Sequence, residues 1–195
     1  MLYSRKYNKQ WLRQDELELM LNNPNISEKY EIWILLMYTP ALRVTEAINI
    51  RVKDIDLEDE CIDIWGGKGR DVTELQKAPC NIRVLKRIKR FCEHSDLRPT
   101  GYIMYSQKSK QVNRSHVYKV FNDICSESGI NKTIGTHTMR RSRAEHLLDK
   151  GLPLTFVSKY LRYKNLSTTM KYLDVSVADI QREMEMIDDC VNALV

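Results

Sequence analysis

The sequence predicts a mainly helical α+β domain that carries one small antiparallel β-hairpin. Most segments repeat apolar residues at intervals of three and four, which is the spacing of one helix face. The stretch CIDIW (61–65) instead alternates apolar and polar residues, as a half-buried strand does, and the glycine-rich turn GGKGR (66–70) follows it. A length of 195 residues, with 43% of them hydrophobic, is enough for the core of one domain.

Two helices are expected in the N-terminal part. RQDELELMLNN (13–23) has the apolar spacing of a helix, and Asp15 is expected to cap it. A second helix is expected over 27–38. Pro40 then ends it, because proline lacks the N–H that a helix interior needs.

A short helix is expected within ALRVTEAINI (41–50). Thr45 can cap it, and Glu46 then falls in its first turn, where a negative charge suits the helix dipole. Arg43 is therefore expected in the turn just before this helix.

The hairpin follows. DVTEL (71–75) can return as the partner strand of 61–65, because glycines favour a tight turn between them. Lys68 is then expected at or near the hairpin tip.

The second half returns to a helical pattern. Apolar stripes and helix stop signals predict helices over 82–94, over 115–129 (capped by Ser115 and stopped by Gly129), over 137–151 (ended by Gly151) and over 152–161 (with Pro153 near its start). The segment 176–194 predicts an amphipathic terminal helix. Its apolar face must pack either on its own body or on another molecule, and the pattern leaves both open.

Composition points to a cytoplasmic protein with a basic body. The formal net charge is +5, basic residues cluster at 66–70, 86–90 and 140–143, and the tail from residue 177 is acidic. The five cysteines are scattered without a C-x-x-C pair, which favours reduced thiols over disulfides or a zinc site. No apolar run approaches the roughly 20 residues of a membrane span. The first residues also lack the apolar region of a secretory signal.

Four motifs follow one another along the chain. They are ALRVTEA (41–47), the hairpin turn GGKGR (66–70), HTMRRSRAEHLLDKG (137–151) and VSKYLRYKNLSTTMKYLD (157–174). Each is common by itself. In this order, on this pattern of helices and hairpin, the sequence resembles the catalytic domain of the tyrosine recombinases, the phage integrase family, over about residues 12–175.

The resemblance implies the tyrosine-recombinase catalytic-domain fold and a set of site residues. Carried over motif by motif, the implied catalytic residues are Arg43, Lys68, His137, Arg140, Tyr163 and Tyr172, with Glu46 supporting Arg43. Neighbouring basic residues are candidates for DNA phosphate contacts: Arg70, Arg141, Arg143 and Lys164. No metal and no cofactor are expected.

Two departures from the family pattern stand in the sequence. The family usually has glycine where Ala41 stands. Its L-G-H motif is replaced here by Leu161, Arg162 and Tyr163, so tyrosine occupies the position of an active-site histidine. A tyrosine can still donate one hydrogen bond to a phosphate oxygen. A packed aromatic without a direct role is the alternative.

The residue types fit DNA strand transfer. Two arginines offer planar sets of donors to the oxygens of a phosphodiester, and Tyr172 offers an oxygen nucleophile. The implied function is a site-specific recombinase or integrase that cleaves and rejoins DNA through a 3′-phosphotyrosyl intermediate. The alternatives are a DNA-binding accessory protein of the same fold, or DNA relaxation like that of a type IB topoisomerase.

The expected partners are double-stranded DNA and further copies of this chain, as a tetramer on paired DNA sites and a monomer alone. The expected organisation is a catalytic domain over 1–176 and a C-terminal helix over 177–195. The family's N-terminal core-binding domain is expected to be absent, because the catalytic pattern begins near residue 12.

Overall fold

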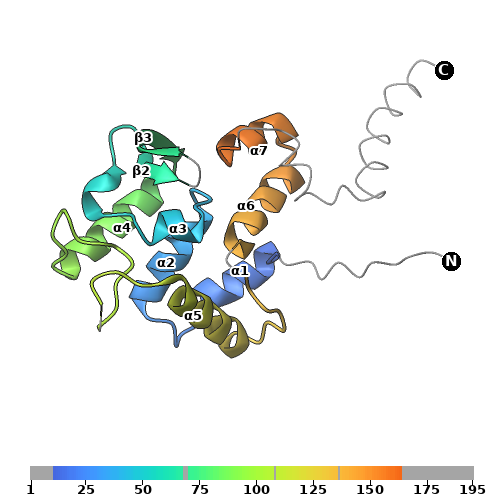
Figure 1. The fold of residues 1–195 in the computed structure, drawn as a ribbon. Helices are drawn as coiled ribbons and strands as arrows, with labels where there is room; N and C mark the ends of the chain where they lie inside the picture. The colour runs from blue at the N-terminus through green and yellow to red at the C-terminus, as the bar shows by residue number, and fades with distance from the viewer. Residues whose placement is uncertain (1–10, 68–69, 108, 136, 164–195) are drawn as a thin grey trace, which may run out of the picture.

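A computed structural model of the chain describes residues 11–67, 70–107, 109–135 and 137–163. Helices precede and follow one small antiparallel sheet in this part of the chain (Figure 1). The predicted fold class, mainly helical with a small antiparallel sheet, is therefore confirmed. The predicted terminal helix over 177–195 lies outside the described residues.

Helix α2 (Glu28–Tyr38) is the central helix of the core. It follows α1 (Gln14–Leu21) and packs against α4 (Ile82–His94) and α6 (Thr138–Asp149). Because α2 is apolar on most of its sides, it can be covered on more than one face. Its buried residues are Ile32, Trp33, Ile34, Leu36 and Met37.

Helix α1 starts earlier than an Asp15 cap would allow. Arg13 occupies its N-cap position, and the carboxylate of Glu16 accepts the backbone N–H of Arg13 at 2.7 Å. The prediction that Asp15 caps this helix is therefore wrong. The helix start is held from inside its first turn by the longer Glu16 side chain, as in one half of a capping box.

The sheet has three antiparallel strands in the order β1-β2-β3. A short 3-10 turn, η1 (Val52–Asp54), leads into β1 (Ile55–Asp56), and β2 (Cys61–Gly67) and β3 (Arg70–Pro79) form the hairpin. The two-residue strand β1 is too short to give a period, and the sequence did not predict it.

The hairpin pairs Cys61 with Pro79 at its base and Gly67 with Arg70 at its far end. The register shifts between Trp65 and Gly67, where Gly66 has φ +68°. Glycine adopts this left-handed conformation without the steric penalty of a Cβ atom. The predicted hairpin is confirmed, and β3 is longer than predicted. Lys68, the predicted tip residue, lies outside the described residues.

Helices α5 (Arg114–Glu127) and α7 (Leu154–Tyr160) complete the described elements. Ser115 does not cap α5; Asn113 does, and its side chain accepts the backbone N–H of His116 at 2.8 Å. The predicted stops are confirmed, because Gly129 and Gly151 follow α5 and α6 with φ +72° and +80°.

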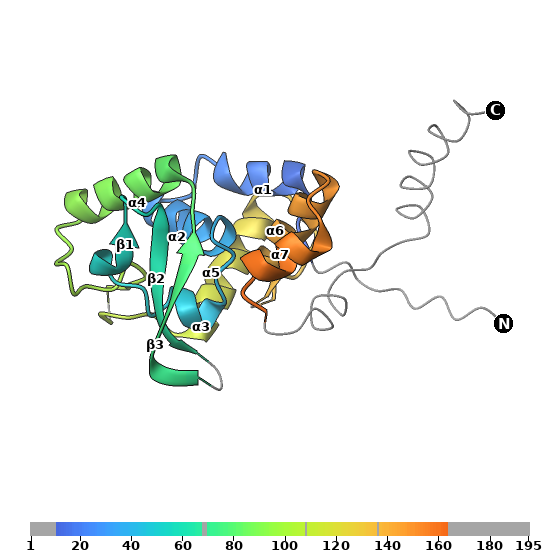
Figure 2. The same ribbon diagram turned by 90° about the horizontal axis from the view of Figure 1, so that it is seen from above.

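Two apolar clusters hold these elements together. The large one joins α2, the sheet, α4 and α5, and a small one consists of Ala41, Ala144, Val157 and Leu161. The small cluster packs the turn before α3 (Val44–Ala47) against α6 and α7. In Figures 1 and 2, α3 accordingly lies between the hairpin and the pair of α6 and α7.

Over the described residues, every helix is too short or too polar to cross a membrane. The cysteines of the same part, Cys61, Cys80, Cys92 and Cys125, are buried free thiols. This agrees with the expectation of reduced cysteines.

Candidate functional site

Arg43 stands at the start of α3, where the sequence places it. It occupies the N-cap position, and Glu46 accepts its backbone N–H at 2.8 Å through Oε2. Glu46 Oε1 accepts the Arg43 side chain through Nη1 at 2.5 Å. The prediction of a Thr45 cap is therefore wrong, because the carboxylate of Glu46 again holds the helix start from inside. Glu46 fixes both the backbone and the guanidinium of Arg43.

The turn that carries Arg43 includes a strained residue. Ala41 has φ +50°, a left-handed conformation that glycine adopts more readily than alanine. Ala41 is fully buried in the small apolar cluster with Leu161. This packing holds its carbonyl group where Arg140 can reach it.

Arg140 comes from α6 and is only 3% exposed. Its Nη1 donates to the carbonyl oxygen of Ala41 at 2.6 Å, and its Nη2 donates to the carbonyl oxygen of Leu161. A buried guanidinium loses its hydration, so these acceptors replace part of what water supplied. Arg140 therefore joins the turn before α3 to the end of α7.

Burial lowers the pKa of Arg140 to about 10, and the charge of Arg43 acts in the same direction. Arg140 still carries its charge at neutral pH. The effect of Arg43 on this pKa reflects two cations brought close together. Such an arrangement favours binding of an anion between or beside them.

His137 is the N-cap residue of α6, one helical turn before Arg140. His137 is exposed at the surface, but its ring loses part of its hydration, which lowers its pKa, and the charges of Arg140 and Arg43 lower this pKa further. The imidazole is consequently neutral at pH 7, so one ring nitrogen can accept a proton or hydrogen bond. The structure brings Arg43, His137 and Arg140 together, although 97 positions separate the first from the last.

Tyr163 lies against both arginines. Its ring centre is 4.7 Å from Cζ of Arg140 and 5.7 Å from Cζ of Arg43, within the range of cation–π contacts. Its hydroxyl accepts a long hydrogen bond from Arg140 Nε at 3.4 Å. The aromatic ring therefore packs beside the guanidinium groups of Arg43 and Arg140, and the hydroxyl lies next to that of Arg140.

Arg162 is a neighbour of this group that the predicted site did not include. Its Nη2 lies 3.0 Å from Glu46 Oε2, and its Nη1 donates to the carbonyl oxygen of Pro40 at 3.1 Å. One feature of the sequence could have pointed to Arg162: it is a charged residue at a position where the family usually has glycine. Its partners lie more than 110 positions away, so sequence spacing could not identify them.

Several predicted site residues cannot be placed against this group. Lys68, Tyr172 and Lys164 lie outside the described residues, and Arg70 is the first residue of β3, where its side chain is not described.

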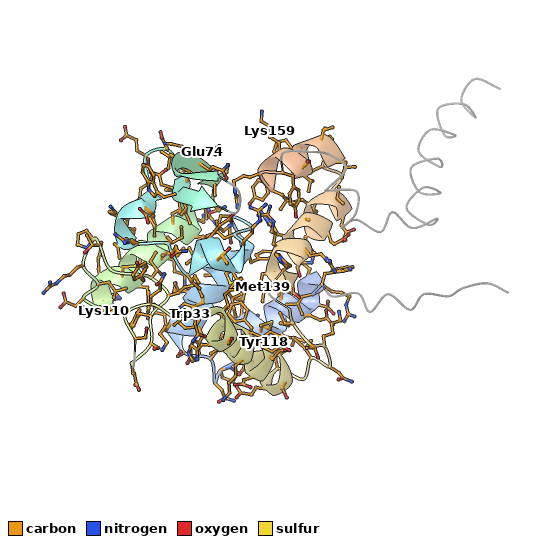
Figure 3. All side chains as sticks on the ribbon, in the orientation of Figure 1. Trp33, Glu74, Lys110, Tyr118, Met139 and Lys159 are labelled. Carbon is orange, nitrogen blue, oxygen red and sulfur yellow. The ribbon has the colours of Figure 1, made fainter. Side chains whose placement is uncertain are left out.

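Two further predicted residues, Arg141 and Arg143, are on α6. The guanidinium of Arg143 packs over the rings of Tyr38 and Tyr160, with its Cζ 5.3 and 5.9 Å from their centres. In Figure 3, Lys159 on α7 and Glu74 on β3 mark the elements on either side of α3.

Among the described residues, the side chains of Asp56, Asp59 and Cys61 are close enough together to be candidate metal ligands. The ammonium of Lys77 already binds Asp59 and lies 3.8 Å from Asp56. These groups lie in the β1–β2 turn and at its strand ends, and Arg43, His137 and Arg140 are not among them.

Comparison with known proteins supplies the family. Residues 10–178 match the profile of the phage integrase family. A tyrosine recombinase of Pseudothermotoga lettingae is 28% identical over 165 residues, which cover 85% of this chain and 56% of that protein. The tyrosine recombinase XerD of Staphylococcus epidermidis is 26% identical over 182 residues, which cover 88% of this chain and 60% of that protein.

Solved structures share the fold. The XerA recombinase has a TM-score of 0.75 and 20% sequence identity, over 91% of this chain and 63% of that chain. The XerH site-specific recombinase, in a post-cleavage complex with a palindromic difH substrate, has a TM-score of 0.75 and 21% identity, over 92% of this chain and 53% of that chain.

The chain spans somewhat more than half the length of the curated relatives it matches. The family profile covers most of the chain, and the solved relatives share the arrangement of helices around a small sheet. The fold, the order of the motifs and the sequence match agree, and the chain belongs to the phage integrase family.

Proposed function

We propose that this chain is the catalytic part of a site-specific DNA recombinase or integrase, which cleaves and rejoins DNA through a 3′-phosphotyrosyl intermediate. One observation carries the proposal: the guanidinium carbons of Arg43 and Arg140, from separate elements, both lie within 6 Å of the Tyr163 ring centre. Two converging guanidiniums suit the oxygens of one phosphodiester. Preorganised donors of this kind are each worth about 2.7–4 kcal/mol in a transition state.

Tyr172 is the proposed nucleophile. Its phenol oxygen forms the new bond to phosphorus, and the bond from phosphorus to the 5′-oxygen breaks. Because a free phenol has a pKa of about 10, Tyr172 needs a positive field or a nearby base to lose its proton. The two arginines supply that field, and neutral His137 can accept or share the proton.

Lys68 is the proposed general acid. It gives its proton to the departing 5′-oxygen, so that this oxygen leaves as a hydroxyl. One phosphoester replaces another in this step. The 5′-hydroxyl of a second DNA strand can therefore attack the phosphotyrosine, restore the phenol and rejoin the strands without another source of energy. Tyr163 is the proposed further donor to a phosphate oxygen.

Double-stranded DNA is the proposed substrate, and Arg70, Arg141, Arg143 and Lys164 are proposed phosphate contacts. The catalytic domain is proposed to span 1–176, with the helix over 177–195 packing either on its own protomer or on a neighbour. A tetramer is proposed on paired DNA sites.

The test is covalent trapping on a suicide substrate. The protein is incubated with nicked duplexes from the DNA that flanks its gene, and protein–DNA adducts are separated under denaturing conditions. Wild type should form an adduct through a 3′-phosphate. Tyr172→Phe, which removes only the nucleophilic oxygen, should form none.

Three results would change the assignment. DNA binding without an adduct on any of these sites would indicate an accessory DNA-binding protein. Relaxation of a supercoiled plasmid without sequence preference would indicate a topoisomerase. An adduct with Tyr172→Phe would show that another residue is the nucleophile.

A further inference from the structure

Arg162 has an unusual backbone for a long side chain. Its φ is +56°, in the left-handed region that glycine enters readily and that other residues seldom adopt. Its side chain is nevertheless only 7% exposed, so the strained backbone directs a guanidinium into the protein rather than into water. Strain of this kind persists only where surrounding contacts hold it.

Apart from a long hydrogen bond of 3.5 Å to the carbonyl oxygen of Tyr160, those contacts involve the turn and helix that carry Arg43. Arg162 donates to the carbonyl oxygens of Pro40 at 3.1 Å and Ala41 at 3.3 Å. It also donates to Glu46 Oε2 at 3.0 Å. The carbonyl oxygen of Ala41 is shared, because Arg140 also donates to it.

Glu46 is consequently placed between two arginines. Arg43 binds it through Nη1 and the backbone N–H, and Arg162 binds it from the end of α7. The Glu46 side chain is 7% exposed, so these charges are poorly screened by water. One carboxylate paired with one arginine has no net charge, whereas this trio keeps one positive charge.

We propose that Arg162 is a positioning residue for DNA cleavage, which shares the carboxylate of Glu46 with Arg43 and so leaves the charge of Arg43 available to the DNA phosphate. This inference rests on the proposed function. Arg162 acts through Glu46 and does not itself need to touch the phosphate. The protein thereby uses a position that the family fills with glycine.

The chain contains a matched control for this arrangement. At the start of α1, Glu16 likewise accepts the backbone N–H of Arg13, and a second cation from a distant segment, Lys132, binds Glu16 Oε2 at 2.5 Å. Lys132→Met therefore removes the second cation from a similar helix start outside the proposed site. Arg162→Met does the same at Glu46.

The first measurement is the rate of adduct formation at saturating suicide substrate. Arg162→Met should slow this step by about 10- to 100-fold, the range found for side chains that orient metal ligands, because Arg162 would likewise act through another side chain. Lys132→Met should change it by less than about twofold, although both variants lower the urea midpoint. Arg162→Lys keeps the charge near Glu46 and should recover part of the rate. An unchanged rate in Arg162→Met, or an equal loss in Lys132→Met, would overturn the inference.

A double-mutant cycle tests whether Arg162 acts through Glu46. In Glu46→Gln the carboxylate charge is gone, so adding Arg162→Met should slow adduct formation by less than about threefold. A full additional loss would mean that Arg162 acts by another route, and the inference would fail.

A second measurement does not depend on cleavage. Among the residues whose side chains the structure describes, the charged groups that face Glu46 are Arg43, Arg162 and, around a cavity of about 370 Å³, Asp54 and Asp63. Burial pulls the pKa of Glu46 upward, but Arg162 and then Arg43 outweigh it and hold the pKa below its ordinary value. NMR titration of the Glu46 carboxyl carbon should show ionisation at higher pH in Arg162→Met and no change in Lys132→Met.

The two claims fail separately. If wild type forms no adduct but the Glu46 titration shifts in Arg162→Met, the proposed function falls and the charge sharing remains. If the titration does not shift, the inference falls whatever the cleavage assay shows.

Discussion

Arg140 and Tyr163 form a stacked pair in which the guanidinium carbon lies 4.7 Å from the ring centre and Nε lies 3.4 Å from the hydroxyl. The ring is the principal contact, since a 3.4 Å hydrogen bond is long. The pair therefore offers two separable properties. The ring covers a buried charge, and the hydroxyl is the group to which the proposed function assigns a hydrogen bond with a phosphate oxygen.

Tyr163→Phe separates these properties. It keeps the ring, so the urea midpoint should stay close to that of wild type. The adduct-forming rate should fall by about 100-fold, the size of effect of removing one transition-state donor. Tyr163→Ala also removes the cation–π contact and should cost about 1–2 kcal/mol of unfolding free energy. A rate for Tyr163→Phe within about threefold of wild type would reduce Tyr163 to a packing residue.

Arg140→Lys should be strongly destabilising despite keeping the charge. A lysine has no planar fork, so it cannot reach the carbonyl oxygens of both Ala41 and Leu161. Leaving one buried acceptor without a donor costs about 1–3 kcal/mol, which urea denaturation can measure. Arg90→Lys, at an exposed position of α4, is the control and should change stability by less than about 0.5 kcal/mol. Equal stability of the two variants would contradict the bridging role of Arg140.

The sequence predicts what depends on local pattern. The hairpin follows from the alternation in 61–65 and the glycines after it, and the ends of α5 and α6 follow from Gly129 and Gly151. Helix starts were less predictable. At Glu16 and Glu46 a carboxylate inside the helix holds the preceding backbone N–H, so the helix begins before the residue expected to cap it.

The contacts within the site depend on residues distant in the sequence. The resemblance to the family implies Arg43, His137 and Arg140 as site residues, and the structure brings these three together. Arg162 is different, because its partner Glu46 is 116 positions away and its backbone conformation is one that propensity assigns to glycine. Only the folded chain shows that this arginine is buried against a carboxylate.

DNA binding by this chain should depend steeply on salt. Its proposed contacts are to phosphates, and each neutralised phosphate releases counterions, so affinity falls with ionic strength. Raising salt from 50 to 200 mM should weaken binding at least about tenfold in a fluorescence anisotropy titration. Arg141→Gln should flatten the dependence of log affinity on log salt by about one unit if it contacts a phosphate. An affinity that barely changes with salt would contradict a phosphate-dominated interface.

Stability should fall as pH drops below neutral, partly because of His146. This histidine is only 5% exposed and its Nδ1 lies 2.7 Å from the Tyr38 hydroxyl. Burial lowers its pKa below the ordinary value of about 6.5, and the charge of Arg143 adds to the effect. Below about pH 6.5 the unfolded chain therefore binds more protons at His146 than the folded chain does. The contribution of His146 to the unfolding free energy is fully present above about pH 6.5, and it is lost as the pH falls toward the lower pKa of the folded state. The urea midpoint of wild type should be lower at pH 5.5 than at pH 7.5. His146→Gln should make this difference smaller. The control, His94→Gln, replaces an exposed histidine and should leave the difference unchanged. An equal difference in all three proteins would assign the pH dependence to other groups.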